Sequence, residues 1–444
     1  MELGSWSLIQ APSLLALIPL IIMIVMAFMG KNNVSGMMVG IIVAALMMGQ
    51  DLGMLASVFK AALGSSTTLI GVIIMTGAGL GVLMTETGVT QTMVYWIVKK
   101  IGVNTQTKAK ISLVVCSILI CGLLGTLGGG NAVISPIILP IMASLGVTPT
   151  VVAALFKTAG EIGLILGPLT GVTLITMEVT GLSYGQLMLQ AALPFAAFWL
   201  AGTWIGCNRA QKLTEGKEFF SMSDEVKDLD AYQPDAKQVR TTLIFLVAFA
   251  ALIVYGVATG QGTAYALIVM VTLAVVLTIA AWIDIDVAVA AVTKGVASMA
   301  NMFLIFVTIE VLLNYVTLGG GFDALSDLLG GLAKGGGATG VMLAASVVGG
   351  FGIEASAVAE IRIIADMFGQ LATEMGLPMG CFAVSILAAT RLTGSMYPTS
   401  NFAGQMGTAQ CANIKGALQA LWFGVAFAWF FVVVYAFVGP MILG

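Results

Sequence analysis

The chain has 444 residues, of which 59% are hydrophobic and 9% are charged, and its formal net charge is −3. Soluble proteins carry roughly 25% charged residues, so this composition excludes an ordinary soluble domain and predicts a polytopic membrane protein. The small net charge gives no indication of nucleic-acid binding, and the lack of histidine excludes histidine metal sites and a histidine proton relay.

Apolar windows of about 20 residues, long enough to cross a membrane, recur along the chain. We predict an all-α fold in which a first repeat, 1–207, and a second repeat, 241–444, each contain five crossings. The linker 208–240 holds a third of all charged residues and is predicted to be a cytoplasmic connector. The crossings are predicted near 11–30, 34–50, 65–85, 150–181 and 185–207, and then near 241–259, 262–283, 299–318, 378–410 and 414–440.

Two further apolar segments, 109–146 and 338–374, are interrupted in the middle by glycine-rich sequences. The interruptions read GTLGGGN at 125–131 and GGFGIEAS at 349–356. Each arm of about 15–18 residues would reach about 22–27 Å as a helix, which is short for a hydrocarbon core of about 30 Å. We therefore predict re-entrant helical hairpins, whose irregular tips are tolerated in a membrane only where they pack in protein or line a cavity.

One local pattern occurs twice in the chain. Residues 146–172 read GVTPTVVAALFKTAGEIGLILGPLTGV, and residues 376–402 read GLPMGCFAVSILAATRLTGSMYPTSNF. Aligned without a gap, Glu161 matches Arg391, and each precedes a break rich in glycine, proline, serine and threonine. Interrupted apolar segments at matching positions of two halves indicate the binding site of a secondary transporter, so we predict a carrier. The predicted broken helices are 150–181 and 378–410.

The distribution of lysine and arginine predicts the orientation. If the N-terminus is outside, thirteen of these residues fall on the cytoplasmic side, whereas Lys60 and Lys334 fall outside. Both termini are then outside and the linker is cytoplasmic. Five crossings per half is an odd number, so the halves are predicted to be inverted repeats, an arrangement that supports alternating access. We expect an integral protein of a bacterial inner (cytoplasmic) membrane.

Ionisable side chains at membrane depth are costly, so each is a candidate functional residue. Arg391 precedes a cluster of hydroxyl and amide groups at the second break, and its guanidinium suits a carboxylate. We interpret Arg391 as a substrate contact, with a structural ion pair to Glu161 or Glu354 as the alternative. The predicted substrate-binding residues are Asn131, Ser135, Thr170, Glu354, Ser356, Arg391, Ser395, Thr399, Ser400 and Asn401.

Glu161 is the predicted coupling residue, because a buried carboxyl group can carry a proton through a transport cycle. Two alternatives remain open: Glu161 contacts a substrate amine, or it is the counter-ion of Arg391 or Lys157. The predicted coupling-ion residues are Glu161, Gly129, Gly130 and Thr173. We predict no metal and no cofactor apart from the coupling ion, which is H⁺ or Na⁺.

Three stretches carry a resemblance to a known group of carriers. They are ALGSSTTLIGVIIMTGAGLGVLMTETG at 62–88, the glycine-rich tip before SPIILPIMASLG at 135–146, and AATRLTGSMYPTSNFAG at 388–404. With the duplicated order of span, hairpin and broken helix, they resemble the ion transporter superfamily, most of all its gluconate permease and C4-dicarboxylate carrier branches. Arg391 falls where the gluconate branch has an arginine in its broken helix, whereas Asn131 replaces the acidic residue of that branch's tip.

The resemblance implies an elevator-type carrier, commonly a homodimer, that moves small organic anions with protons or sodium. We therefore predict a secondary active transporter of a carboxylate such as a sugar acid or a dicarboxylate. Alternatives are an amino-acid symporter, which would use Arg391 and a glutamate for a zwitterion, and a Na⁺/H⁺ antiporter without an organic substrate. An enzyme is not predicted, because the sequence has no metal-ligand cluster, catalytic triad or cofactor motif. The expected partners are a small-molecule substrate, membrane lipid and a second copy of the chain, and no nucleic acid.

Overall fold

The computed structural model describes residues 2–29, 31–220, 233–350 and 357–444. Within these residues the regular elements are helices, and there is no strand. Seven of the described helices are long and apolar enough to cross a membrane, or eight if the bent pair Ile285–Ser298 and Phe303–Leu318 forms one span. The protein is therefore an all-helical polytopic membrane protein.

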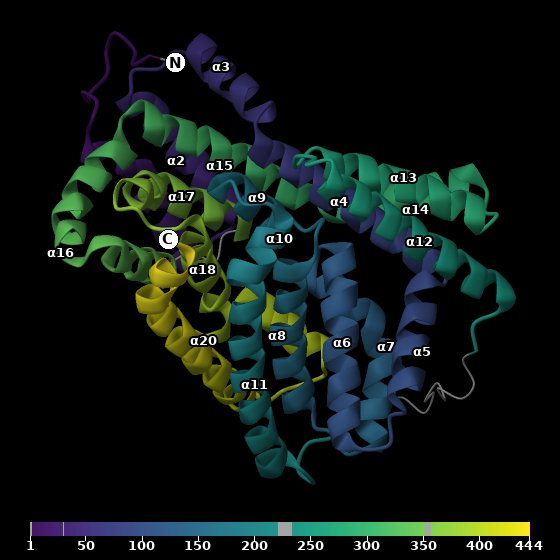
Figure 1. Ribbon diagram of the computed structural model, residues 1–444. Helices are drawn as coiled ribbons and strands as arrows, with labels where there is room; N and C mark the ends of the chain where they lie inside the picture. Colours follow the sequence, from purple (N-terminus) through teal and green to yellow (C-terminus); the bar gives the residue numbers. More distant parts are fainter. Residues whose placement is uncertain (1, 30, 221–232, 351–356) are drawn as a thin grey trace.

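The part of the chain before the charged linker folds into a series of helices joined by short turns (Figure 1). A 3-10 turn precedes the first of them, and a π-helical turn joins the last two. They are η1 (Leu14–Leu17), α1 (Ile18–Phe28), α2 (Asn33–Met47), α3 (Leu52–Leu63), α4 (Ser66–Glu86), α5 (Val89–Ile101), α6 (Gln106–Leu124), α7 (Leu127–Ser144), α8 (Pro149–Leu166), α9 (Gly171–Thr180), α10 (Tyr184–Leu187), η2 (Met188–Ala192) and α11 (Leu193–Thr214).

The part after the linker is also a series of helices. Its helix α16 is kinked at Gly337, whose φ of 55° is in the left-handed region that glycine adopts readily. The elements are α12 (Ala236–Ala258), α13 (Tyr265–Ala280), α14 (Ile285–Ser298), α15 (Ala300–Leu318), α16 (Gly321–Gly350), α17 (Ala357–Glu374), α18 (Met379–Arg391), η3 (Thr393–Ser395), α19 (Ser400–Thr408) and α20 (Ile414–Leu443).

Two helices, α3 and α14, were not predicted from the sequence. Helix α3 has 12 residues with Lys60 in its last turn, and α14 has 14 residues with Asp286 in its first turn. Both are too short to cross a core of about 30 Å, so a search for long apolar windows passes over them. Helices α1, α2 and α13 have 11, 15 and 16 residues and are shorter than the crossings predicted there.

The long helix α4 packs against α13 and α14, and α15 packs against α2 and α3. Each long helix thus lies on two shorter helices from the other part of the chain. Related pairings recur further on, because α6 packs on α8 as α16 packs on α18. Contacts between distant parts of the sequence therefore hold the two parts of the chain together.

Helices α6 and α7 form a helical hairpin with its turn at Gly125, where φ is 66°. With 19 and 18 residues, both arms are long and apolar enough to cross a membrane, so re-entrance stays a prediction. The predicted tip of the second hairpin includes residues 351–356, which lie outside the described residues. Helix α7 packs against α19, and α17 packs against α9, so each hairpin contacts the broken helix of the other part of the chain.

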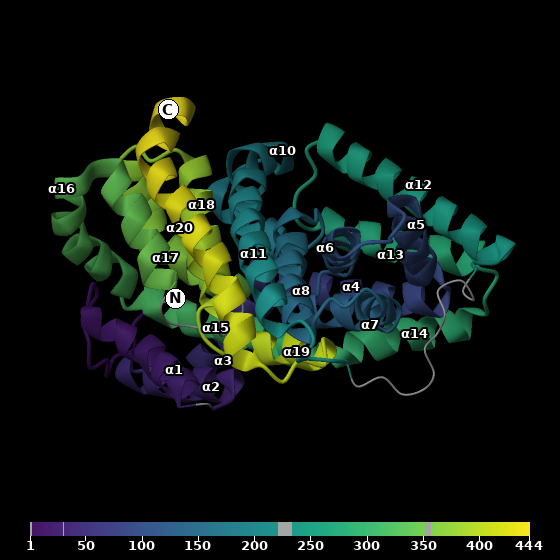
Figure 2. The same cartoon turned by 90° about the horizontal axis from the view of Figure 1, so that it is seen from below.

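Helices α11 and α20 run side by side (Figure 2). Their contact depends on glycine, since a Cβ atom at Gly202 would lie 2.3 Å from the Phe423 carbonyl oxygen. A Cβ at Gly206 would lie 2.1 Å from the carbonyl oxygen of Ala420. Such close backbone approach is typical of helix interfaces in membranes, where small residues allow dense packing.

Candidate functional site

Three ionisable side chains meet in the interior of the protein. The Lys157 ammonium donates a hydrogen bond of 2.7 Å to Glu161 Oε1, and Arg391 Nη1 donates one of 2.7 Å to Glu161 Oε2. The exposed fractions of Lys157, Glu161 and Arg391 are 1%, 3% and 6%. One carboxylate is thus shared by two cations, and this ion cluster carries a net positive charge.

The broken helices bring these side chains together. Lys157 and Glu161 lie one turn apart on α8, a spacing at which side chains on a helix are neighbours. Arg391 is the last residue of α18, directly before the turn that separates α18 from α19. The two residues that matched in the duplicated sequence pattern, Glu161 and Arg391, therefore form a direct ion pair.

The burial of this ion cluster has an energetic consequence. Removing each charge from water costs several kcal/mol. Deleting one partner of a buried ion pair costs in general about 3–5 kcal/mol, because the other charge is left buried without its partner. Arg391 also donates a 3.3 Å hydrogen bond from Nε to Thr390 Oγ1. The cations and the carboxylate are thus held at fixed positions, as recognition of a small ion requires.

The ion cluster lines a cavity of about 450 Å³ between the two broken helices. Its wall combines the turn of the first hairpin, both helix breaks and the start of α15. The lining residues are Asn33, Ile74, Gly125, Thr126, Leu127, Gly128, Gly129, Lys157, Glu161, Leu164, Thr170, Gly171, Val172, Met299, Asn301, Ile305, Phe306, Val358, Glu360, Thr390, Arg391, Thr393, Gly394 and Asn401.

Several helices begin at this cavity, among them α7, α9 and α19. Thr126 precedes α7, Thr170 precedes α9, and Asn401 lies in the first turn of α19. The first N–H groups of a helix have no partner within the helix, and the N-terminal end carries a partial positive charge. Together with Lys157 and Arg391, these helix ends make the cavity suited to an anion.

Five of the residues predicted from the sequence line the cavity. The lining set is Gly129, Glu161, Thr170, Arg391 and Asn401. The predicted residues that are described but do not line it are Gly130, Asn131, Ser135, Thr173, Ser395 and Thr399. Glu354, Ser356 and the side chain of Ser400 lie outside the described residues.

Asn131 is fully buried and holds three segments together. Its Oδ1 accepts a 2.6 Å hydrogen bond from Ser117, and its Nδ2 donates to the Phe156 carbonyl at 2.9 Å and to Gln405 Oε1 at 2.7 Å. These bonds connect the first hairpin to α8 and α19. Gly130, beside it, packs against Cys121, whose Sγ would lie 2.6 Å from an added Cβ.

The hydroxyl groups near the breaks mostly bond to backbone. Thr170 and Thr399 accept hydrogen bonds from backbone N–H groups in the first turns of α9 and α19. Thr173 donates to the carbonyl of Ile165, and Ser135 donates to the carbonyl of Ala132. Ser395 is different, because its buried Oγ has no hydrogen-bond partner among the described residues.

Several lining residues were absent from the sequence-based prediction. Lys157 was considered only as a possible counter-ion, although its position four residues before Glu161 in an apolar run is a visible signal. Asn33 and Asn301 lie far from both broken helices in the sequence, and nothing in their local sequence distinguishes them. Within the described part of the chain no group of three or more His, Cys, Asp or Glu residues could hold a metal ion.

Two solved transporter structures have similar folds. Neisseria gonorrhoeae MtrF, described with a class of antimetabolite efflux pumps, has 14% identity and a TM-score of 0.63, covering 100% of this chain and 97% of that chain. The Alcanivorax borkumensis YdaH transporter, described as having an unusual topology, has 16% identity and a TM-score of 0.56. The match covers 88% of this chain and 89% of that chain. At these identities the likeness shows the fold alone. No curated protein matches the chain.

A family model provides the more specific finding. The model named DcuC, C4-dicarboxylate anaerobic carrier, matches residues 58–442. The match includes both broken helices and the ion cluster, and it confirms the resemblance to C4-dicarboxylate carriers predicted from the sequence. Because this match extends over most of the chain, the chain belongs to the DcuC family of C4-dicarboxylate anaerobic carriers.

Proposed function

We propose that the protein is a secondary active transporter that carries a C4-dicarboxylate through the cavity between the broken helices. The observation that supports this proposal most is the buried cluster of Lys157, Glu161 and Arg391 on the cavity wall. Two fixed cations complement the two carboxylates of such a substrate. A guanidinium binds a carboxylate through two parallel hydrogen bonds, and an ammonium acts as a compact point charge.

The coupling mechanism follows from the carboxylate that both cations share. Glu161 occupies the hydrogen-bonding groups that a substrate carboxylate would use. Protonation of Glu161 would release Lys157 and Arg391, whose two positive charges would then match a dianion. Glu360 of α17 also faces the cavity, and its protonation would raise the number of protons carried with each substrate to two. We therefore propose symport with H⁺, and Na⁺ is the alternative coupling ion.

The transport cycle that we propose is of the elevator type. We infer that 1–207 and 241–444 are inverted repeats, with re-entrant hairpins at 109–146 and 338–374. The crossed packing of α4 on α13 and α14, and of α15 on α2 and α3, supports a framework shared by both repeats. Along this framework the hairpins and broken helices would move as one unit. We further propose a homodimer in a bacterial inner membrane, with both termini outside and the linker cytoplasmic.

Transport by purified protein in proteoliposomes tests the substrate and the coupling ion together. We expect an inward H⁺ gradient to drive accumulation of succinate, fumarate or malate. Gluconate and neutral amino acids, which lack the second carboxylate, should be transported with an efficiency at least about tenfold lower, because a hydrogen bond to a charged group contributes about 1.5–3 kcal/mol. The assay measures initial uptake of labelled compound with H⁺ or Na⁺ gradients imposed separately.

Two outcomes would contradict the proposal. Preferred uptake of an amino acid would favour a zwitterion site in which a glutamate contacts the substrate amine. Exchange of Na⁺ for H⁺ with no uptake of any organic acid would favour an antiporter. Liposomes without protein, and protein with the gradient collapsed by an ionophore, serve as controls for leak and for coupling.

A further inference from the structure

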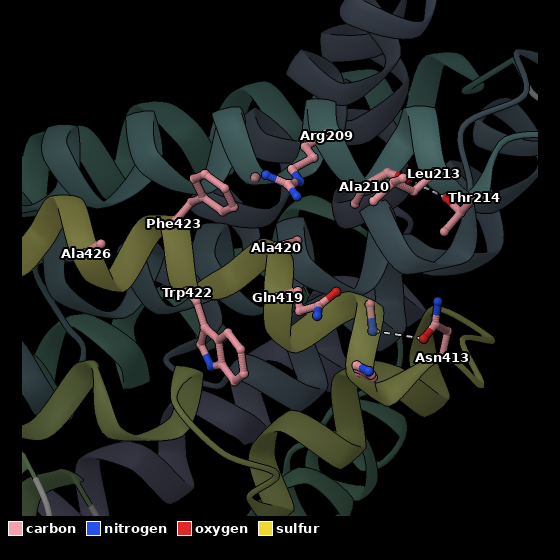
Figure 3. A pocket seen from close by; sticks show the side chains of 13 residues that line it. Arg209, Ala210, Leu213, Thr214, Asn413, Gln419, Ala420, Trp422, Phe423 and Ala426 are labelled. Carbon is pink, nitrogen blue, oxygen red and sulfur yellow. Dashed lines mark hydrogen bonds between the residues drawn. The ribbon is translucent and has the colours of Figure 1, made fainter.

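A second cavity lies between the C-terminal part of α11 and the N-terminal part of α20 (Figure 3). This α11–α20 groove has a volume of about 540 Å³ and contains no residue of the ion cluster. Its lining residues are Gly206, Arg209, Ala210, Leu213, Thr214, Asn413, Lys415, Gly416, Gln419, Ala420, Trp422, Phe423 and Ala426.

The charges in the groove have one sign. Arg209 and Lys415 are basic and exposed, and no acidic residue is among the lining residues. The Arg209 guanidinium lies 5.8 Å from the centre of the Phe423 ring. Figure 3 shows these two side chains next to each other. This cation–π contact orients the guanidinium without neutralising its charge. The groove therefore presents two positive charges to a ligand.

The rest of the groove is mostly apolar, and its uncharged polar residues are Thr214, Asn413 and Gln419. Small residues, among them Gly206, Ala210 and Ala420, line the groove together with the larger side chains of Leu213 and Phe423. From Lys415 to Ala426 the lining residues span eleven residue steps of α20, which correspond to about 16 Å along the helix axis. One leaflet of a hydrocarbon core is about 15 Å thick, so the groove has the length of one acyl chain.

The surface around the groove is of the kind that contacts lipid. Trp422 is 49% exposed and donates a 2.9 Å hydrogen bond from its indole nitrogen to the Met396 carbonyl. Further along α20, Phe430 and Phe437 are 62% and 60% exposed. Tryptophan is enriched where the hydrocarbon core meets the head groups, and exposed phenylalanine suits the core itself. The basic end of the groove adjoins the linker that we propose to be cytoplasmic.

We propose that the α11–α20 groove binds an anionic phospholipid of the cytoplasmic leaflet. The phosphate would lie at Arg209 and Lys415, and one acyl chain would follow the apolar wall towards Ala426. Basic pockets between transmembrane helices on the cytoplasmic side are suited to anionic head groups. A free phosphate or dicarboxylate would leave the apolar length of the groove unused. The groove is therefore suited to a ligand with a charged head and a long apolar tail.

The test uses full-length protein purified in detergent and depleted of lipid. We compare the wild type, the double variant Arg209→Gln/Lys415→Gln, and the control Lys100→Gln/Lys212→Gln, which removes two exposed charges that do not line the groove. Phosphatidylglycerol should raise the melting temperature of the wild type and the control, and native mass spectrometry should detect retained lipid. The groove variant should bind phosphatidylglycerol roughly 30-fold more weakly.

Three results would overturn the proposal. The first is equal stabilisation of the wild type by phosphatidylcholine, which lacks the net negative charge. The second is equal stabilisation by glycerol phosphate, which has the anion without the chains. The third is unchanged lipid retention by the groove variant together with loss of dimers in detergent, which would assign the groove to a second copy of the chain.

Discussion

Replacement of Arg391 by alanine is expected to abolish uptake of dicarboxylates while the protein still inserts and purifies. The variant loses both hydrogen bonds of the guanidinium fork, and each bond to a charged group contributes about 1.5–3 kcal/mol, so the efficiency of uptake should fall at least about 100-fold. Arg391→Lys retains the charge without the planar fork, and we expect a loss of at least about tenfold. Initial rates of succinate uptake in proteoliposomes measure both effects.

The structure explains why the fold should survive the loss of Arg391. Glu161 keeps the Lys157 ammonium at 2.7 Å, so the variant retains a neutral buried pair and no isolated charge. Arg362 provides a matched control, because it forms an ion pair with Asp366 at 3.3 Å and does not line the cavity. We expect Arg362→Ala to leave transport largely intact. If the double variant Arg391→Ala/Glu161→Ala regained transport of the same anion, Arg391 would have served only to neutralise Glu161.

Replacement of Glu161 by glutamine is expected to separate substrate binding from coupling. The amide cannot carry a proton, and it leaves Lys157 and Arg391 with two positive charges for the substrate. We therefore expect exchange of internal for external succinate to persist, whereas accumulation driven by a pH gradient should be lost. Counterflow and gradient-driven uptake, measured on the same proteoliposomes, distinguish the two activities.

Glu360→Gln is the comparison for this second prediction, because Glu360 is the other carboxyl group among the described residues that line the cavity. If Glu161 carries the coupling proton, Glu360→Gln should retain accumulation driven by the pH gradient. A different outcome would assign the coupling proton to Glu360 of α17. In that case Glu161→Gln would keep full gradient-driven accumulation and Glu360→Gln would lose it.

The sequence favours substrate contact for Arg391, with an ion pair to Glu161 or Glu354 as the alternative, and the structure contains the pair with Glu161. A charged residue in an otherwise apolar run stands out, and the duplicated pattern placed Glu161 opposite Arg391, which the structure joins at 2.7 Å. The breaks after Leu166 and Arg391 were visible because glycine, proline and hydroxyl residues interrupt apolar helices there. Local chemistry determines such features, so they can be recognised in the sequence without the tertiary structure.

Other features depend on packing that the local sequence does not encode. The sequence predicts that Asn131 binds substrate at the tip of the first hairpin, whereas in the structure its amide donates a hydrogen bond to Gln405, which is 274 residues away. Asn301 reaches the cavity because α15 packs against α4, which a linear pattern cannot reveal. Short helices such as α3 carry too few apolar residues to register as spans, although they form part of the helix packing.

The location of the substrate is tested most directly by a cysteine at Gly128. This residue lines the cavity, and an added Cβ there meets no atom within 4 Å, so the substitution fits. The five native cysteines are buried, which keeps background labelling by a polar maleimide low. Gly185→Cys is the control, since Gly185 is exposed, equally open and not among the residues that line the cavity.

We predict that succinate slows labelling of Gly128→Cys in a concentration-dependent manner and leaves labelling of Gly185→Cys unchanged. The protecting concentration should match the one that half-saturates transport. Equal labelling rates of Gly128→Cys with and without saturating succinate, in protein that still transports it, would contradict a substrate site between the broken helices.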